Sequence, residues 1–387
     1  MNTIKIGLLG LGNIGTGAYK TLLMNETHIS HLLGARLEIS RILEKDTERD
    51  RGIYIDKRKF TQTPDDIFND PEIRIVIELL GGVEPATSFM LAAMNAGKSV
   101  VTANKAAVAA NYFKLMETAR RNNVEFRFEA SVGGGIPVIN ALSTVLRANQ
   151  IEEVLGIVNG TTNYILTQMA DSGLDYKEAL SAAQDKGFAE ADPSSDVEGT
   201  DAANKLTILT ALAFGKYIAP EEIPTKGITS VTKNDIEAAS KEGCKIKLIA
   251  KASIKNGKLE CSVEPVKLPL SHPLSGVSNE FNAIYITGNA VGELMFYGKG
   301  AGPFPTGSAI VGDVMEIAKM IIYCKMCRGE ILDDVRSEYD YDQDCSSDNP
   351  NGSSCDFASE IDREVDCSSD NCCDSKYCTP GGGCGCY

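Results

Sequence analysis

The stretch "IKIGLLGLGNIGTGAYKTLL", residues 4–23, decides the fold. Its apolar beginning predicts a buried strand, and the residues after the last glycine have the pattern of a helix. Gly10, Gly12 and Gly15 lie between the two in G-x-G-x-x-G spacing. In a dinucleotide-binding turn these glycines permit the tight bend, the approach of backbone N–H groups to a pyrophosphate, and the packing of helix on strand. The strand–turn–helix context favours this interpretation over a glycine turn in an unrelated α/β fold, and predicts a cofactor-binding loop that includes Asn13 and Ile14.

A second strand is expected near residues 35–46, "ARLEISRILEKD". Glu44 falls at its end, where an acid bonds a ribose 2′-hydroxyl and favours NAD. Lys45, Arg49 and Arg51 follow closely, and these cations are suited to a 2′-phosphate instead. Both NAD and NADP therefore remain open as cofactors.

Two further buried strands are predicted within residues 74–82 and 98–109, with a helix between them. Because ligands of a doubly wound sheet lie beyond the carboxyl ends of its strands, we expect Gly81, Thr102 and Lys105 near the nicotinamide. Residues 122–142 then predict a strand, three glycines and a helix with Pro137 in its first turn. On sequence physics alone a packing turn is the favoured interpretation of these glycines, with a ligand or cation site as the alternative.

The middle of the chain predicts a different kind of sheet. Residues 151–163 form a strand that ends in "NGTT", where backbone amides at Gly160 and Thr161 can receive a carboxylate. From Lys226 onward, charged and apolar pieces alternate as in strands with one face wet. Such a sheet beside a dinucleotide-binding domain suggests burial against a second subunit, so we expect a homodimer.

Two later segments carry candidate site residues. Gly302 and Thr306 are expected to wrap back over the cofactor, with Thr306 or Gly307 capping a long helix. Earlier, residues 189–209 gather five carboxylates and one lysine before an apolar run. Asp201 and Lys205 are four residues apart and share one face of a predicted helix, for which Thr200 or Asp201 is the simplest cap. Because Lys205 opens directly into apolar residues, its ammonium needs paired acids, and a lysine held in this way can carry a proton.

Composition bounds the class of protein. The 387 residues allow two or three domains, contain no run of eighteen apolar residues, and begin with a core-strand pattern, so we expect a cytoplasmic protein that does not enter a membrane. The net charge of -15 argues against nucleic acid as a partner. That charge is uneven, because residues 328–387 hold 15 acids against 4 bases.

The C-terminal segment departs from the rest of the chain. Ten of the 12 cysteines follow Tyr323, among many acids, serines and glycines, so the tail is expected to be disordered without a ligand. A C-x-x-C at Cys324 and Cys327 and the dense later cysteines suit a soft metal. The alternative is a shifted reading frame near Cys324.

Six motifs in order give the chain a family resemblance. "GLGNIG", "TANK", "GGGIPVI", "NGTTNYIL", "GFAEADPSSDVEGTDAANK" and "GAGPFPTGSAIVGD" resemble homoserine dehydrogenase across residues 4–323. The resemblance implies reversible NAD(P)-dependent interconversion of L-aspartate 4-semialdehyde and L-homoserine, a step in threonine, methionine and isoleucine biosynthesis. It implies that Lys205 is the catalytic acid/base, that Lys105 assists at the reacting oxygen, and that Glu190, Asp196 and Asp201 hold the substrate. It also implies a monovalent cation, sodium or potassium, at Glu129, Val132, Gly134 and Ile136.

The expected architecture is α/β. A Rossmann-type domain covers residues 1–135, an α+β substrate-binding and dimerisation domain covers 136–300, a helix over 301–325 returns to the first domain, and the tail is 326–387. Two other functions are compatible with the scaffold: another amino-acid dehydrogenase, and a non-catalytic dinucleotide-binding protein.

Overall fold

The computed structural model describes residues 2–327, and the chain up to Ala318 forms one compact unit. The predictions for residues 328–387, disorder and soft-metal binding among them, lie outside the described residues. Within the described range, no group of three or more His, Cys, Asp or Glu side chains is placed to hold a metal ion. None of the described helices is both long and apolar enough to cross a membrane.

The first sheet is parallel and has six strands. Their spatial order is β3 (Phe60–Thr61), β2 (Ala35–Leu43), β1 (Asn2–Leu9), β4 (Ile73–Glu78), β5 (Ser99–Thr102) and β6 (Phe126–Arg127). This 3-2-1-4-5-6 order is that of a Rossmann fold, in which the chain reverses direction across the sheet between β1 and β4. The predicted dinucleotide-binding fold is confirmed.

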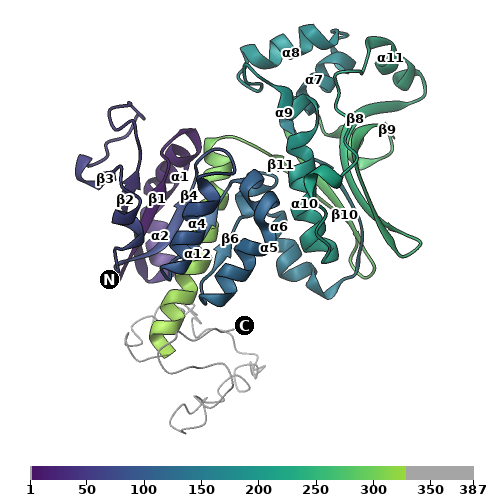
Figure 1. Cartoon of the computed structure of the whole chain (residues 1–387). Helices are drawn as coiled ribbons and strands as arrows, with labels where there is room; N and C mark the ends of the chain where they lie inside the picture. The colour runs from purple at the N-terminus through teal and green to yellow at the C-terminus, as the bar shows by residue number, and fades with distance from the viewer. Residues whose placement is uncertain (1, 328–387) are drawn as a thin grey trace, which may run out of the picture. The chain divides into compact units, whose positions relative to one another are not determined.

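The helices of this layer are α1 (Asn13–Met24), α2 (Glu26–Leu33), α3 (Asp65–Phe68), α4 (Ala86–Asn95) and α5 (Lys105–Arg121), with a 3-10 turn η1 at Lys57–Lys59. Figure 1 also shows the part of α12 (Pro303–Cys327) that ends at Ala318 beside this sheet. A Cβ built on Gly17 of α1 would lie 2.1 Å from the Pro303 carbonyl oxygen, and one built on Gly307 would lie 2.8 Å from Ala18 N. The two glycines therefore let α1 and α12 approach at backbone distance.

The beginning of α12 corrects a prediction. Thr306 and Gly307 were expected as caps, but the helix begins at Pro303 and contains both. Proline suits a first helical position because it has no N–H to leave unpaired, and its φ is already helical. Thr306 N donates to Gly302 O at 3.1 Å. The first hydrogen-bonded turn of α12 is therefore formed before Thr306, and Thr306 cannot be its N-cap.

The second sheet is antiparallel and has five strands. Their order is β11 (Gly292–Lys299), β10 (Phe281–Gly288), β7 (Ile151–Ile157), β8 (Cys244–Lys255) and β9 (Lys258–Pro269). The helices and turns of this part are α6 (Val138–Ser143), α7 (Gly160–Asp171), α8 (Tyr176–Asp185), α9 (Ser194–Val197), α10 (Thr200–Phe214) and α11 (Lys233–Lys241), with 3-10 turns η2 (Glu129–Ser131), η3 (Val145–Ala148), η4 (Pro220–Glu222) and η5 (Pro273–Gly276). On one face, Leu155, Ile249 and Tyr285 pack with Leu274 of η5.

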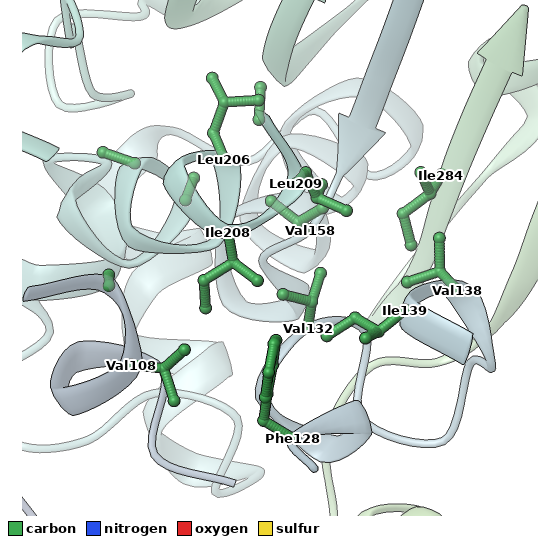
Figure 2. Packing of buried hydrophobic residues seen from close by; sticks show 14 of the residues in the cluster. Val108, Phe128, Val132, Val138, Ile139, Val158, Leu206, Ile208, Leu209 and Ile284 are labelled. Carbon is green, nitrogen blue, oxygen red and sulfur yellow. The ribbon is translucent and has the colours of Figure 1, made fainter. Parts of the chain in front are cut away.

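A single apolar core joins the two layers. Figure 2 shows Val108 of α5 and Phe128 facing Ile208 of α10, with Val132 and Ile139 close by. These side chains are buried, and they come both from the segment that contains α5 and from α10, about one hundred residues later in the chain. Because α5 and α10 meet in this core, the strand-end loops of the first sheet are held against the first turns of α10.

Candidate active site

Three charged side chains meet where α5 and α10 pack together. Asp201 Oδ2 lies 2.7 Å from Lys205 Nζ, and Asp201 Oδ1 lies 2.8 Å from Lys105 Nζ. The Asp201 and Lys205 side chains are 3% and 9% exposed, whereas that of Lys105 is 42% exposed. The predicted catalytic residues are thus brought together, with one carboxylate between a buried ammonium and a half-exposed one.

Local structure explains why Lys205 is buried. Helix α10 begins after Gly199, whose φ of 91° is left-handed, so the expected caps Thr200 and Asp201 are both inside the helix. This corrects the prediction, and the physical reason is that the Asp201 carboxylate pairs with two ammonium groups and is not available to its own backbone. Leu206 and Ile208, which follow on the same helix, are fully buried, and their packing places Lys205 at the edge of the core.

The electrostatics separate the two lysines. Burial lowers the pKa of Lys205, and the neighbouring Lys105 charge adds to this, so the pKa stays below its ordinary value despite Asp201. The charge of Asp201 raises the pKa of Lys105. Burial alone raises the pKa of Asp201, but the two ammonium groups outweigh it and hold that pKa well below its usual range. Asp201 therefore stays ionised, and Lys205 is the amine that gives up a proton more readily.

Asn159 completes this cluster and was not among the predicted site residues. Its Nδ2 donates to Asp196 Oδ1 at 2.7 Å and to Asp201 Oδ2 at 2.8 Å, and its Oδ1 accepts from Thr162 N at 2.9 Å as the N-cap of α7. Lys205 Nζ also donates to the Val158 carbonyl at 2.6 Å. The motif "NGTT" after an apolar strand was the available signal, but it indicated a helix start and not a partner for residues forty positions away.

The predicted substrate-binding residues surround the same point. Gly160 and Thr161 are the first residues of α7, whose amino end offers unpaired backbone N–H groups. The Thr161 hydroxyl lies 2.7 Å from the Phe188 carbonyl and 3.0 Å from Asp196 Oδ2, so it is already engaged. Glu190 is exposed, and its charge adds to the raised pKa of Lys105.

The glycine-rich turn has the shape that a pyrophosphate requires. Gly10 has φ 92°, in the region that favours glycine. A Cβ on Gly15 would come 2.3 Å from the Gly10 carbonyl oxygen, so helix and strand touch there. A Cβ on Gly12 would meet nothing within 4 Å, so the space beside it is open. Asn13 and Ile14 begin α1, whose amino end faces this space.

Glu44 is bound to this turn by its own carboxylate. Its Oε2 accepts from Leu11 N at 2.9 Å, and its Oε1 accepts from Lys45 N and Asp46 N at 2.8 and 3.1 Å. Arg51, buried beside it, donates Nε to the Leu11 carbonyl. A pocket of about 280 Å³ lies alongside the turn, and its lining includes Asn13, Lys20, Arg49 and Arg51.

The remaining predicted positions lie after β4, at the end of β5 and around the beginning of α12. Gly81 is exposed with open space at its Cα, and Thr102 is fully buried with its hydroxyl donating to Glu78 Oε2 at 2.6 Å. Gly302, at φ 115°, comes just before α12, and Thr306 is buried in the first turns of that helix. The Thr102 hydroxyl is therefore bonded to a buried protein group. Its partner Glu78 is, after Asn159, the second residue of this region that the sequence did not single out.

The predicted cation ligands form one turn. Gly133 O accepts from Ile136 N and Ile136 O accepts from Val138 N, which leaves the Val132 and Gly134 carbonyls without a backbone partner in the described chain. The Glu129 carboxylate is not free, because Ile139 N and Asn140 N donate to its two oxygens at 2.9 and 2.6 Å.

Comparison with known proteins places this geometry in a family. A family model described as homoserine dehydrogenase matches residues 137–315, and one described as the NAD binding domain of homoserine dehydrogenase matches residues 10–129. The chain is 44% identical over 319 residues to homoserine dehydrogenase of Bacillus subtilis strain 168, covering 82% of this chain and 74% of that one. The chain belongs to the homoserine dehydrogenase family.

Solved structures agree. A homoserine dehydrogenase from Thiobacillus denitrificans superposes with a TM-score of 0.80 at 40% identity, covering 84% of this chain and 75% of that one. A hyperthermophilic archaeal homoserine dehydrogenase in complex with NADPH gives a TM-score of 0.70 at 27% identity, covering 81% of this chain and 97% of that one. The chain is therefore an NAD(P)-dependent oxidoreductase of the homoserine dehydrogenase type, and the comparisons support this function over a non-catalytic dinucleotide-binding protein.

Proposed function

We propose that Lys205 is the acid/base of homoserine dehydrogenase chemistry in this chain, with Asp201 orienting it and Lys105 assisting at the reacting oxygen. The observation that carries the proposal is the pairing of both lysines with the one buried carboxylate of Asp201. The family activity implies L-homoserine and L-aspartate 4-semialdehyde as substrates. A nicotinamide, when bound, would supply the hydride chemistry.

The residues then divide the remaining work. When the alcohol of homoserine is oxidised, Lys205 in its neutral form takes the hydroxyl proton, and in the reverse direction its ammonium returns that proton to the aldehyde oxygen. Lys105 keeps its charge because its pKa is raised, so it stabilises negative charge on the same oxygen. Asp201 holds both amines at fixed distances, so neither lysine side chain has to be ordered during the reaction.

The substrate is a zwitterion and needs two further partners. The first backbone amides of α7, at Gly160 and Thr161, suit its carboxylate because a helix amino end attracts anions. The exposed carboxylate of Glu190 would receive the ammonium group of the substrate. Asp196 accepts a hydrogen bond from Asn159 and would support the Asn159–Asp201 contact.

We propose that NADP is used, and NAD less well. The pyrophosphate would be held by Gly10, Gly12, Asn13, Ile14 and Gly15. Among the three glycines of this turn only Gly12 has open space beside it, and α1 begins at the next residue. Both oxygens of Glu44 already accept backbone N–H groups, whereas Lys20 and Arg49 line the adjoining pocket and suit a 2′-phosphate. The check is kcat/KM with each cofactor: Arg49→Ala should reduce the value for NADP and leave that for NAD.

A monovalent cation is proposed at the carbonyl oxygens of Glu129, Val132, Gly134 and Ile136. The support is that the Val132 and Gly134 carbonyls of this turn have no backbone partner in the described chain, and neutral oxygen donors suit a hard, singly charged ion. This site is tested by thermal unfolding in potassium, in sodium and in a quaternary ammonium salt of equal ionic strength. An ion that binds only the folded protein raises its Tm.

We also propose a homodimer formed through the second sheet, in the cytoplasm. On β11, Met295 and Tyr297 are 42% and 53% exposed, and Tyr297 stacks on Phe281 at 5.2 Å, which gives that edge an apolar surface. Sedimentation of the wild type and of Met295→Glu tests the dimer. Fractionation of cells tests the compartment.

Lys205→Ala tests the central proposal. We expect turnover to fall on the order of a hundredfold or more, the usual scale for a general acid, with cofactor affinity unchanged. Homoserine oxidation is measured at saturation, and cofactor binding is measured by NADPH fluorescence. Near-normal turnover in this variant rules the role out.

A further inference from the structure

A buried carboxylate stands at the point where three parallel strands end. Glu78 is the last residue of β4, and it pairs in register with Leu9, the last residue of β1, and with Thr102, the last residue of β5. Its exposed fraction is 0%. The chain continues from Leu9 into the phosphate turn and from Thr102 towards Lys105, so Glu78 lies between the cofactor loop and the catalytic cluster.

The hydrogen bonds of Glu78 reach both loops. Leu80 N donates to its Oε1 at 2.6 Å, and the Thr102 hydroxyl donates to its Oε2 at 2.6 Å. The backbone of Leu79 and the side chain of Leu80 pack against Gly10: a Cβ placed there would meet Leu79 O at 2.9 Å and Leu80 Cδ2 at 3.1 Å. One oxygen therefore fixes the loop that borders the phosphate turn.

The other oxygen leads to Lys105. The Thr102 hydroxyl accepts from Asn104 N at 2.9 Å, and Asn104 Nδ2 donates to the Leu80 and Gly82 carbonyls at 3.1 and 2.7 Å. Asn104 Oδ1 accepts from Ala107 N at 3.1 Å and so caps α5, which begins at Lys105. The direction in which Lys105 leaves the sheet is thus set by a chain of bonds that begins at Glu78.

Packing alone does not account for a carboxylate here. The other residues of β4 near this end, Ile75 to Ile77, are apolar and buried, and an apolar side chain would fill the same space. Burial raises the pKa of Glu78 to about 7, against the opposing effect of its hydrogen bonds, which shows that the position is costly for an ionised group. Costly buried acids at the ligand-binding edge of a sheet are a mark of function.

We propose that Glu78 is a positioning residue for the redox step: it locks the loops after β4 and β5 so that the phosphate turn and Lys105 keep a fixed relative geometry. This inference rests on the proposed roles of Lys105, Asp201 and Lys205. It assigns to Glu78 no contact with substrate or cofactor.

The test compares Glu78→Leu and Glu78→Gln with a matched control, Lys98→Met. Lys98 is 3% exposed and ties the same strands at their opposite end, where its Nζ donates to the Asp70 and Ile73 carbonyls at 2.6 and 2.9 Å. Four quantities are measured on each full-length protein: kcat for homoserine, the isotope effect with deuterium on the carbon that loses hydride, the NADPH dissociation constant by fluorescence, and Tm.

We expect Glu78→Leu to lower kcat by roughly tenfold to a hundredfold, the scale of an ångström of misplacement. The isotope effect should rise, the NADPH dissociation constant should increase about three- to tenfold as the loop beside Gly10 loosens, and Glu78→Gln should fall between wild type and Glu78→Leu. Lys98→Met should lower Tm but keep kcat and the isotope effect. Wild-type kcat and isotope effect in Glu78→Leu, or the same loss of kcat in Lys98→Met, overturns the proposal.

A second route applies if Glu78→Leu does not fold. Thr102→Val removes the hydroxyl at nearly constant volume and should lower kcat in the same direction. The double variant Glu78→Gln/Thr102→Val should then be no worse than its worse single parent, whereas additive losses contradict a shared path. Lys205→Ala is assayed in parallel: if it keeps turnover, the proposed acid/base role fails, and the NADPH dissociation constants still decide whether Glu78 orders the loops.

Discussion

Replacing Asp201 with asparagine removes the one charge that both catalytic lysines share. At 2.7 and 2.8 Å from Lys205 and Lys105, each pair has a Coulomb energy of about 6 kcal/mol at an effective dielectric constant of about 20. Much of this offsets desolvation, so the net cost of losing one partner of a buried pair is about 3–5 kcal/mol. Asp201→Asn keeps the shape and, through its one oxygen, the bond from Asn159, while the charge and the oxygen that accepts from Lys105 are lost together, so the cost reports the loss of the ion pairs.

The pH dependence of that cost has a definite sign. Burial already lowers the pKa of Lys205 below its ordinary value of 10.5, and removing the Asp201 charge, which raises it, lowers that pKa further in the folded variant. Because the unfolded lysine keeps its ordinary pKa, the unfolded variant then binds more protons than the folded variant, so the variant regains stability as the pH rises towards 10.5. The gap between the variant and wild type is therefore widest near neutral pH and narrows as the pH rises towards 10.

Denaturant unfolding from pH 7 to pH 10 measures this gap, and homoserine oxidation measures the accompanying loss of turnover. Glu242→Gln is the control, because it breaks an exposed ion pair of 2.8 Å with Lys267, for which we expect a change within about 1 kcal/mol. An Asp201→Asn protein as stable as wild type, or a gap that stays constant with pH, refutes the electrostatic account.

Two further predictions test the cofactor turn and a buried amine. Gly12→Ala should fold with a normal Tm but bind NADPH more weakly, because its methyl group enters open space beside the turn, whereas Gly15→Ala should lose stability against the Gly10 carbonyl; equal Tm losses in both would contradict the assignment. Lys247 is 2% exposed, and burial lowers its pKa to about 8 from 10.5, so wild type should gain about 3 kcal/mol over Lys247→Met between pH 8 and 10.5. Parallel pH series of unfolding check the latter, and a difference in unfolding free energy between the two proteins that stays constant from pH 8 to 10.5 would show the pKa of this amine to be unperturbed.

Local patterns predicted a large part of this protein. The apolar run before Gly10 and the helix after Gly15 indicated the nucleotide-binding turn, because strand and helix periods are visible within ten residues. The spacing of Asp201 and Lys205 indicated a shared helix face for the same reason. The caps of α10 and α12 were predicted wrongly, since helix ends depend on where a side chain finds its partner, and Asp201 finds its partners outside its own backbone.

The sequence by itself determined the strand, turn and helix around Gly10 to Gly15 and that a lysine enters the core behind acids. It did not determine α11 (Lys233–Lys241), which lies in the stretch from Lys226 that was predicted to form strands. Only the tertiary structure decided that Asn159 joins Asp196 to Asp201, and that Glu78 links Leu80 to Thr102. These partners are separated along the chain and share no period. They meet because parallel strands end at one edge of a sheet and because two helices bury a common apolar face, and neither event leaves a mark in the local order of residues.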